Sequence, residues 1–429
     1  MATARFEPAG PLRGSLRPPA DKSISHRAAL IAAMGEGETR IEGYLDAADT
    51  RSTLAAVAAL GARVDEGREL GRELKITGVG LRGPRSATID VGNAGTLLRL
   101  LPGWLAGQEE GEWTLDGDDS IRRRPVDRIA VPLSQMGARV DAREGLPPLG
   151  VHGTPLRGID YEMPVASAQV KSCLLFAGLL AEGVTRVKSE HRSRDHSERM
   201  LAAAGASIER AEAAVVVRPT KRLKPRRIDV PADISSAAFF VVAAALVAGS
   251  EVVLERVGVN PTRTGILTVL ERMGADLEVH PEGDHGGEPV ARLVVRPAPL
   301  RGTEVGGEEI PLAIDELPLL ALAACFAEGT TTIRDAEELR RKESDRVETV
   351  STALTALGAK VEPTADGMVV EGGGGLRGGG ISSHGDHRIA MLGAVAGLAS
   401  AEGVEVEGME AAAVSYPGFE ADLRSLLVS

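Results

Sequence analysis

The sequence has few cysteines and few aromatic residues. Only 2 of its 429 residues are cysteine, and aromatic residues make up 3% of the chain. Cys173 and Cys325 both lie in apolar stretches, where we expect a thiol to act as a small buried hydrophobic group. Two isolated cysteines provide neither a disulfide framework nor a cysteine-based metal site.

Other signatures are also missing. No apolar run reaches the roughly 18 residues that a membrane-spanning helix requires, and the opening residues, MATARFEPAG, lack the apolar core of a signal peptide. The 8 histidines show no metal-ligand spacing, and no Walker A or dinucleotide-binding glycine motif occurs. The formal net charge of -12 argues against a general nucleic-acid or membrane-surface binder. We expect a cytoplasmic protein with no metal and no cofactor.

What the sequence does contain is a repeat. Six stretches begin with polar or charged residues, continue as almost wholly apolar helical runs, and end in glycine. They span residues 19–37, 91–107, 165–183, 232–249, 314–329 and 385–403. A helix that is apolar on every side must be buried, so these are interpreted as inner helices covered by sheet. Outer amphipathic helices end in Gly-Ala before a strand, at Gly61, Gly137, Gly205, Gly274 and Gly358.

Each copy therefore predicts a βαβαββ unit, and six units divide most simply into two lobes of three. The last unit lacks its final strand, so we expect the N-terminal segment to complete it. This places residues 1–20 and 232–429 in one lobe and residues 21–231 in an inserted lobe. The chain would cross between the two lobes near residues 18–21 and 230–233. Both segments contain proline, and we expect them to act as hinges. The predicted fold class is α/β, with two lobes of buried helices covered by sheets.

The polar beginnings of the inner helices indicate anion binding. Ser235, Ser236 and Glu316 are interpreted as helix caps. Lys22, Arg27 and Arg388 need another explanation, because a cation at a helix N-terminus opposes the macrodipole unless an anion lies beside it.

The connectors before the outer helices add further cations, among them Arg124 and the KESDR segment from Lys342 to Arg346. Two carboxylates, Asp315 and Glu343, would then face a basic pocket. Such an arrangement suits general acid–base chemistry on a substrate that carries phosphate or carboxylate groups.

Taken together, these motifs closely resemble the 5-enolpyruvylshikimate-3-phosphate (EPSP) synthase family of enolpyruvyl transferases. The motifs, in chain order, are DKSISHR (21–27), GNAGT (92–96), RRPVDR (123–128), SAQVKS (167–172), SRDHSERML (193–201), NPTRTG (260–265), IDELP (314–318), ELRRKESDR (338–346) and DHRIAM (386–391). The resemblance implies a two-lobed inside-out α/β barrel, in which each lobe has three βαβαββ units with buried parallel helices. It also implies transfer of the enolpyruvyl group of phosphoenolpyruvate to the 5-hydroxyl of shikimate 3-phosphate, with phosphate released through a tetrahedral intermediate. That reaction belongs to the shikimate pathway, which leads to chorismate and the aromatic amino acids.

The resemblance also assigns roles to residues. It implies shikimate 3-phosphate contacts from Lys22, Ser23, Arg27, Ser167, Gln169, Ser193, Arg194, Asp315 and Lys342. It implies phosphoenolpyruvate contacts from Lys22, Gly95, Thr96, Arg124, Gln169, Arg346 and Arg388. Asp315 is expected to accept the proton of the 5-hydroxyl, and Glu343 or Lys22 to exchange a proton with the methylene carbon of phosphoenolpyruvate. Val414 stands where some members have a lysine, so no contact is expected from that connector.

Further expectations and alternatives accompany this resemblance. Gly95 predicts sensitivity to the inhibitor glyphosate, because a larger side chain there crowds the inhibitor in relatives. Nothing in the sequence demands an oligomer, so we expect a monomer. One alternative is the related transferase that acts on UDP-N-acetylglucosamine, which uses a cysteine in a mobile loop. The other is a non-catalytic binder of phosphorylated metabolites.

Overall fold

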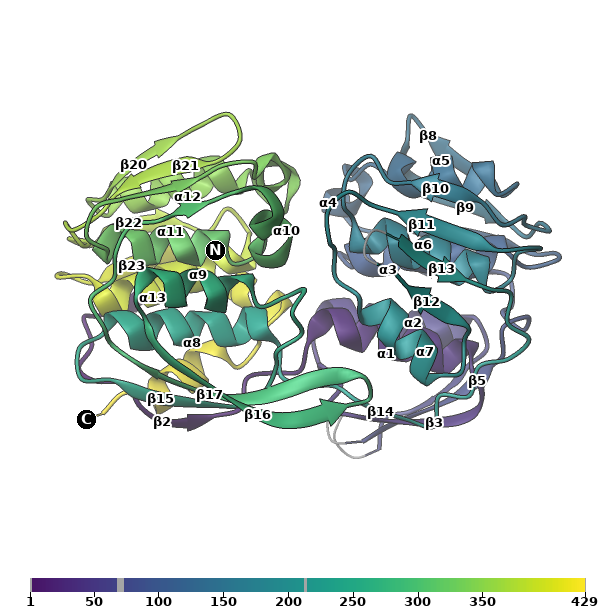
Figure 1. The fold of residues 1–429 in the computed structure, drawn as a ribbon, viewed down its shortest axis with the longest axis horizontal. Helices are drawn as coiled ribbons and strands as arrows, with labels where there is room; N and C mark the ends of the chain where they lie inside the picture. Colours follow the sequence, from purple (N-terminus) through teal and green to yellow (C-terminus); the bar gives the residue numbers. More distant parts are fainter. Residues whose placement is uncertain (1, 68–72, 212–213, 429) are drawn as a thin grey trace. The chain divides into compact units, whose positions relative to one another are not determined.

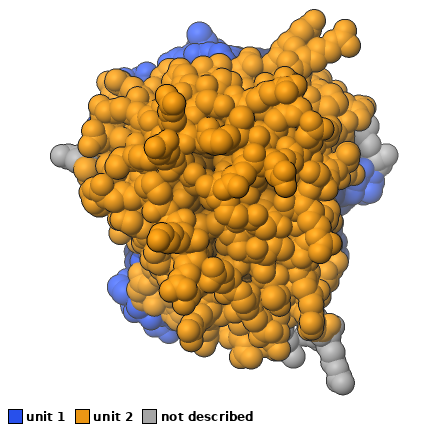
Figure 2. Space-filling model, turned by 90° about the vertical axis from the view of Figure 1, so that its right-hand side faces the viewer, with its two compact units in different colours: residues 1–19, 232–283, 289–429 blue, residues 20–231, 284–288 orange. Residues whose placement is uncertain are grey.

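The structure, a computed structural model, describes residues 2–67, 73–211 and 214–428 of the chain (Figure 1). The predicted lobe that contains both termini would also include Met1 and Ser429, which lie outside the described residues. The chain divides into two compact units. Unit 1 comprises residues 1–19, 232–283 and 289–429, and unit 2 comprises residues 20–231 and 284–288, whose surface fills the view in Figure 2.

Unit 2 contains three four-stranded sheets and three inner helices among its described residues. The inner helices are α1 (Lys22–Met34), α3 (Gly95–Ala106) and α6 (Ala168–Gly178), and the outer helices are α2 (Ala48–Ala59), α4 (Asp119–Arg122), α5 (Asp127–Gln135) and α7 (His196–Ala203). The first sheet has the order β14 (Arg227–Asp229), β3 (Glu36–Glu42), β5 (Leu74–Val79), β4 (Arg63–Asp65). The second has the order β6 (Ala87–Asp90), β7 (Glu112–Asp116), β9 (Leu146–His152), β8 (Arg139–Arg143). The third has the order β10 (Asp160–Glu162), β11 (Thr185–Lys188), β13 (Ala214–Val217), β12 (Ile208–Arg210).

Unit 1 repeats this plan, with inner helices α8 (Ile234–Leu246), α11 (Leu317–Phe326) and α13 (His387–Ala399) packed against one another. Its outer layer includes α9 (Gly265–Met273), α10 (Ile310–Ala313), α12 (Arg346–Ala356), α14 (Phe419–Ser425) and the 3-10 helices η1 (Gly307–Glu309), η2 (Glu337–Arg341) and η3 (Met409–Val414). One sheet has the order β16 (Asp276–His285), β17 (Glu288–Arg296), β15 (Glu251–Gly258), β2 (Arg13–Leu16). The next has the order β18 (Glu304–Val305), β19 (Thr330–Ile333), β21 (Met368–Glu371), β20 (Lys360–Pro363). The last has the order β1 (Thr3–Phe6), β23 (Val404–Glu407), β22 (Gly379–Ser382).

The strand pairing confirms the βαβαββ unit. In the second sheet, β6 and β7 are parallel and flank α3 in the chain, whereas β8 and β9 follow the outer helices as an antiparallel pair. A parallel pair needs such a helical crossover, while an antiparallel pair needs only a short turn. A glycine follows each of five outer helices, and all five have φ between 94° and 105°. They are Gly61, Gly137, Gly205, Gly274 and Gly358. Only glycine adopts this left-handed conformation without cost, so it stops each outer helix before its strand.

Two strands are exchanged between the repeats. Helix α1 follows β2 in the chain, but the strand parallel to β3 in its sheet is β14. Helix α8 follows β14, but the strand parallel to β15 is β2. The chain passes from one unit to the other directly after each exchanged strand, at Pro19–Ala20 and Pro231–Ala232. The N-terminal strand β1 pairs antiparallel with β23 and completes the sheet that the last repeat leaves short.

The contact-based division differs from the sequence-based one at two places, of which the first is Ala20, which groups with unit 2. Residues 284–288, at the turn between β16 and β17, group with unit 2, whereas the sequence-based division puts them in the lobe with both termini. Among the described residues, no helix is both long and apolar enough to cross a membrane.

The inner helices are buried, as their composition predicts. In α8, every residue from Ile234 to Ala245 is excluded from solvent. Cys173 in α6 and Cys325 in α11 are free and buried, and burial raises the pKa of the Cys325 thiol to about 12. Both cysteines therefore act as small hydrophobic groups, as expected. Helices α3 and α6 approach so closely that a Cβ on Gly103 would lie 2.0 Å from the carbonyl oxygen of Cys173.

Candidate functional site

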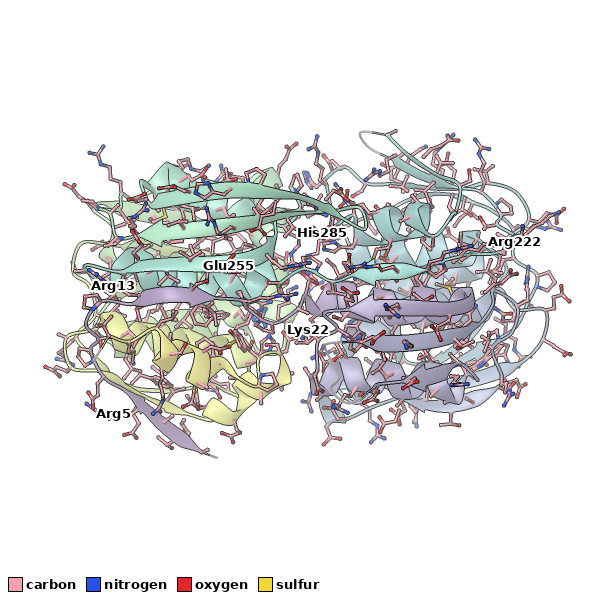
Figure 3. All side chains as sticks on the ribbon, turned by 90° about the horizontal axis from the view of Figure 1, so that it is seen from below. Arg5, Arg13, Lys22, Arg222, Glu255 and His285 are labelled. Carbon is pink, nitrogen blue, oxygen red and sulfur yellow. The ribbon has the colours of Figure 1, made fainter. Side chains whose placement is uncertain are left out.

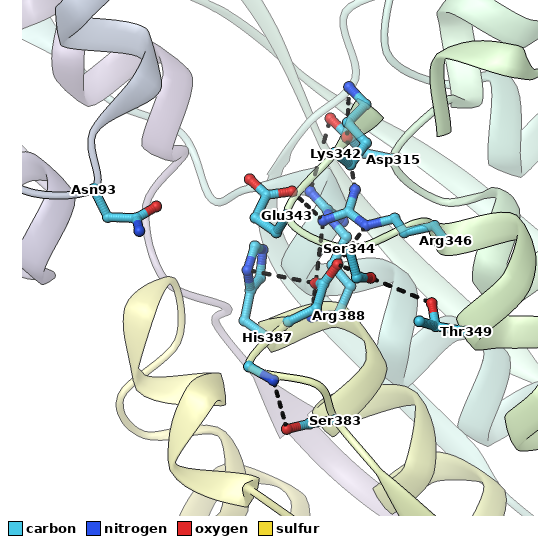
Figure 4. Close-up of polar contacts among 12 residues, drawn as sticks. Asn93, Asp315, Lys342, Glu343, Ser344, Arg346, Thr349, Ser383, His387 and Arg388 are labelled. Carbon is cyan, nitrogen blue, oxygen red and sulfur yellow. Dashed lines mark hydrogen bonds and ion pairs between the residues drawn. The ribbon is translucent and has the colours of Figure 1, made fainter. Parts of the chain in front are cut away.

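The carboxylates expected to move protons gather around one buried arginine in unit 1 (Figure 4). Arg346 is the first residue of α12 and is 1% exposed. Its Nη2 lies 2.7 Å from Oε2 of Glu343, and its Nη1 lies 3.4 Å from Oδ1 of Asp315. Its Nε lies 2.8 Å from Oδ2 of Asp386. Three carboxylates from three segments of the chain are thus held by a single guanidinium.

The opposite charges of Arg346 and its carboxylate neighbours shift the pKa values of Arg346 and Asp386. Burial alone would lower the pKa of Arg346, but the carboxylates of Asp386, Glu343 and Asp315 raise it above its ordinary value. Burial opposes ionisation of Asp386, yet the adjacent Arg346 keeps the pKa of that carboxyl below its ordinary value. A buried pair of opposite charges with these shifts stays ionised at neutral pH.

Asp315 lies just before α11 and faces three cations. Its Oδ1 lies 3.6 Å from Nζ of Lys342 and its Oδ2 lies 3.8 Å from Nη2 of Arg388, in addition to the contact with Arg346. The Asp315 side chain is 13% exposed and that of Lys342 is 24% exposed. A partly exposed carboxylate in such a position is of the kind that accepts a proton from a hydroxyl group in general base catalysis.

Arg388 stands at the start of α13. Asp386 caps this helix, with Oδ1 accepting a hydrogen bond from the Arg388 backbone nitrogen at 2.9 Å. Asp386 therefore both caps α13 and holds Arg346. The sequence identified Asp386 as part of a polar helix start but did not assign it to the site, whereas the structure places its fully buried carboxylate against Arg346.

The interpretation of Ser235 and Ser236 as caps is wrong, because both lie inside α8, whereas Glu316 occupies the cap position of α11 without a capping hydrogen bond from its side chain. The cap of α8 is Asp233, whose Oδ1 accepts from the backbone nitrogen of Ser235 at 2.8 Å. The Ser235 hydroxyl instead donates to Oε1 of Glu316 across the core. Glu316 makes no capping hydrogen bond to α11, and its Oε1 lies 3.7 Å from Nη1 of Arg388. Residue type alone does not distinguish capping from a longer-range contact.

In unit 2, Lys22 is the first residue of α1 (Figure 3). Its Nζ lies 3.1 Å from Oδ2 of Asp49 on α2, and its side chain is 23% exposed. Asp21 caps α1 by accepting from the backbone nitrogen of Ile24 at 2.8 Å. Asp49 is a partner of Lys22 that sequence reasoning missed, since nothing in the α2 segment marks it.

Arg27 lies one turn further along α1 and is buried. Its Nε donates to the Ser197 hydroxyl at 2.8 Å, its Nη2 to the Ser172 hydroxyl at 3.0 Å, and its Nη1 to the carbonyl of Ser23 at 2.9 Å. Burial lowers the pKa of Arg27 to about 10, the carboxylate of Glu198 opposes this shift, and the charge of Arg194 adds to it. Arg27 is therefore cationic at neutral pH and close to a second cation, which favours an anion nearby.

The remaining predicted residues of unit 2 lie at two other helix starts. Ser167 caps α6, accepting from the backbone nitrogen of Val170 at 3.4 Å, and Gln169 donates to the Thr96 hydroxyl at 3.2 Å. This second contact joins the starts of α3 and α6. Ser193 is 9% exposed, and its carbonyl accepts from Nζ of Lys171, which also lies 2.6 Å from the Glu198 carboxylate.

Gly95 opens α3 beneath two arginines. A Cβ built on it would lie 2.7 Å from Nη1 of Arg124 and 3.0 Å from Nη1 of Arg99. Arg124 also donates to Oδ1 of Asn93 at 3.1 Å and to the Ser120 hydroxyl at 3.2 Å. Because Gly95 has no side chain, the Arg124 guanidinium can lie directly beside the start of α3.

The structure thus brings Asp315, Lys342, Glu343, Arg346 and Arg388 together in unit 1. In unit 2 it joins Lys22 to Asp49, Arg27 to Ser23, and Gln169 to Thr96. Among the described residues, no group of three or more histidine, cysteine, aspartate and glutamate side chains is arranged to hold a metal ion.

The chain is similar to known proteins over nearly its whole length. A family model described as EPSP synthase (3-phosphoshikimate 1-carboxyvinyltransferase) matches residues 6–423. The chain belongs to the EPSP synthase family. A 3-phosphoshikimate 1-carboxyvinyltransferase of Methylococcus capsulatus is 49% identical over 423 residues, covering 98% of this chain and 96% of that protein. Another, from Geobacter sulfurreducens, is 48% identical over 432 residues and covers 100% of both chains.

The solved structure of the EPSP synthase from Acinetobacter baumannii is also similar. It superimposes with a TM-score of 0.90 at 41% sequence identity, and the match covers 100% of this chain and 99% of that one. Similarity over the full length shows that both units of the chain belong to the EPSP synthase fold, with six repeats of buried helices enclosed by sheets.

Proposed function

We propose that the chain transfers the enolpyruvyl group of phosphoenolpyruvate to the 5-hydroxyl of shikimate 3-phosphate, using the residues described above. This is the reaction of the EPSP synthase family, to which the chain belongs. The observation that carries the assignment of residues is that Asp315 and Glu343 both contact the buried guanidinium of Arg346, at 3.4 Å and 2.7 Å. Two carboxylates at fixed positions provide one group for each of two proton transfers.

Shikimate 3-phosphate is bound mainly by unit 2 in this proposal. Lys22 and Arg27 provide charge for its phosphate and carboxylate groups, and Arg194 adds to this positive field. Hydroxyl and amide groups provide further hydrogen bonds, from Ser23, Ser167, Gln169 and Ser193. Asp315 and Lys342 of unit 1 complete the set, with the Asp315 carboxylate directed to the 5-hydroxyl.

In this proposal phosphoenolpyruvate is bound mainly by cations, with further contacts at three uncharged residues. The proposed residues are Lys22, Gly95, Thr96, Arg124, Gln169, Arg346 and Arg388. Guanidinium groups suit this substrate, because their paired donors match the geometry of phosphate and carboxylate oxygens. Arg124 and Arg388 are held by partners on neighbouring segments, which lowers the entropy lost on binding.

The chemistry requires balanced proton transfers. Asp315 accepts the proton of the 5-hydroxyl as the oxygen forms a bond to C2 of phosphoenolpyruvate, and Glu343 or Lys22 gives a proton to C3. The product of this step is a tetrahedral intermediate. The same group then takes a proton back from C3 while the bond between C2 and the phosphate oxygen breaks, which restores the double bond and releases phosphate. Arginine side chains stabilise the negative charge on the departing phosphate.

Two alternatives are less well supported. The transferase that acts on UDP-N-acetylglucosamine needs a reactive loop cysteine, but Cys173 and Cys325 are buried within α6 and α11 and have raised pKa values. A non-catalytic binder would not need two carboxylates on one arginine. The test is phosphate release from phosphoenolpyruvate, measured with shikimate 3-phosphate, with UDP-N-acetylglucosamine and with neither. Release only with shikimate 3-phosphate is expected, and any other pattern would contradict the proposal.

Four further expectations accompany this function. The chain crossings at Pro19–Ala20 and Pro231–Ala232 are proposed as hinges for a closure driven by shikimate 3-phosphate. Small-angle scattering should then show compaction when this substrate is added, and identical curves would argue against hinges there. We also propose a cytoplasmic monomer that does not bind nucleic acid, consistent with the net charge of -12; light scattering tests the monomer.

A further inference from the structure

A chain of buried polar contacts joins the starts of the three inner helices of unit 1. Nη2 of Arg263 donates to the Ser235 hydroxyl at 2.6 Å and lies 3.4 Å from Oδ1 of Asp233, the cap of α8. The Ser235 hydroxyl donates in turn to Oε1 of Glu316, directly before α11. The same Oε1 lies 3.7 Å from Nη1 of Arg388, in the first turn of α13.

The chemistry of these groups fixes the direction of the hydrogen bonds. A guanidinium only donates, so Arg263 must donate to the oxygen of Ser235. The single hydroxyl proton of Ser235 is then available for Glu316, which accepts it. A carboxylate that accepts a hydrogen bond and faces a guanidinium is stabilised in its ionised form. The Ser235 hydroxyl and the Arg388 guanidinium thus both face Oε1 of Glu316, whose side chain is 1% exposed.

Arg388 is shared between two adjacent carboxylates. Its Nη1 faces Glu316 at 3.7 Å and its Nη2 faces Asp315 at 3.8 Å. The two carboxylates differ in accessibility, because the Asp315 side chain is 13% exposed and that of Glu316 only 1%. Asp315 has two more cationic neighbours, Lys342 and Arg346. During the proposed reaction Asp315 also gains a proton, which removes its attraction for Arg388.

We propose that Glu316 is a positioning residue that holds the guanidinium of Arg388 in place for phosphoenolpyruvate while Asp315 changes its protonation state. The inference rests on the proposed role of Arg388 and extends it to a residue that does not itself contact the substrate. Its specific consequence is that the charge of Glu316, rather than its volume, determines the apparent affinity for phosphoenolpyruvate.

Two substitutions separate charge from shape. Glu316→Gln keeps the size and an oxygen that accepts from Ser235, but removes the charge. Glu316→Asp keeps the charge and shortens the side chain. We expect Glu316→Gln to raise the KM for phosphoenolpyruvate by about tenfold, the lower end of what a charge-assisted contact contributes, with the KM for shikimate 3-phosphate unchanged. Glu316→Asp should raise it less. A purely structural role predicts the reverse order, since the glutamine is the closer match in shape.

A double-mutant cycle tests whether the effect passes through Arg388. In the Arg388→Ala background, Glu316→Gln should cause little further change in the KM for phosphoenolpyruvate, because the interaction is already lost. Asp422→Asn is a matched control in the same unit, since Asp422 accepts from the Tyr416 hydroxyl at 2.7 Å, away from these residues. It should leave both KM values as they are.

The outcomes separate this inference from the proposed function. If the parental chain releases no phosphate with both substrates, the proposed function fails. If the parental chain is active and Glu316→Gln leaves the KM for phosphoenolpyruvate unchanged, or adds its full effect to that of Arg388→Ala, the inference is wrong. If Glu316→Gln does not fold, as judged by circular dichroism, Ser235→Ala decides. This variant should raise the same KM to a lesser extent, and an unchanged value would overturn the inference.

Discussion

Nε of Arg346 lies 2.8 Å from Oδ2 of Asp386, and both side chains are excluded from solvent. The pair joins the start of α12 to the cap of α13, and the remaining nitrogens of Arg346 hold Asp315 and Glu343. The position of Asp315, the proposed general base, therefore depends on the contact between Arg346 and Asp386 within the protein.

Asp386→Asn should strongly destabilise unit 1. Breaking a buried ion pair costs about 3 to 5 kcal/mol, and we expect the lower end of this range because Arg346 keeps its contacts with Asp315 and Glu343. Urea unfolding measures the change in the free energy of unfolding. Glu371→Gln is the control, because its ion pair with Lys360 is exposed and contributes no more than about 1 kcal/mol. Equal effects of the two substitutions would contradict the importance of the buried pair.

Asp315→Asn should lower kcat with little effect on binding of shikimate 3-phosphate. The amide keeps the size of the side chain but cannot accept the hydroxyl proton, so we expect a loss of about 100-fold or more. Steady-state kinetics gives kcat, and isothermal titration calorimetry gives the affinity for shikimate 3-phosphate. A variant that turns over at the parental rate would exclude Asp315 as the base.

Arg388→Ala should mainly weaken the capture of phosphoenolpyruvate. A charge-assisted contact contributes about 1.5 to 3 kcal/mol, so the KM for phosphoenolpyruvate should rise about 10- to 100-fold. The measurement is initial velocity against phosphoenolpyruvate at saturating shikimate 3-phosphate. An unchanged KM would count against the assignment of Arg388 to this substrate.

Gly95→Ala should reduce inhibition by glyphosate. The parental chain is expected to be sensitive, and the added methyl group would lie 2.7 Å from Nη1 of Arg124. The guanidinium must move to avoid this contact, which alters the proposed site for phosphoenolpyruvate. Inhibition is measured at low phosphoenolpyruvate for both proteins. A parental chain that is unaffected by the inhibitor, or a variant as sensitive as the parent, would show that the prediction is wrong.

Stability should fall in mild acid because of His26. This side chain is buried, its Nδ1 lies 2.6 Å from the Thr53 hydroxyl, and burial lowers the pKa of His26 from 6.5 to about 3. Between these values the unfolded chain binds a proton that the folded chain does not, so stability is lost as pH falls below 6.5.

The free energy of unfolding should therefore fall by about 2 kcal/mol more between pH 6.5 and pH 5 in the parent than in His26→Gln. Urea unfolding at the two pH values measures this difference. His280→Gln, at a position whose side chain is 44% exposed, is the control and should behave like the parent. Equal pH dependence in parent and His26→Gln would contradict the prediction.

The sequence alone determined the repeat and the nature of its helices. Uniformly apolar composition requires burial, so the stretch from Ile234 to Leu246 could only be an inner helix. Cations such as Lys22 and Arg388 at helix starts indicated anion binding, and the Gly-Ala endings marked where outer helices stop. These are local properties, and local pattern is sufficient to predict them.

The tertiary structure decided which partners these residues have. Arg346 and Asp386 are 40 residues apart in the chain, and no spacing rule connects them. Ser235 and Glu316 have the composition of caps, but packing of α8 beside α11 makes a cross-core hydrogen bond available to them instead. The exchange of β2 and β14 likewise depends on which strand edge is open, because any strand offers the same backbone groups. Sequence pattern specifies the kind of element, whereas long-range packing determines the contacts that side chains make.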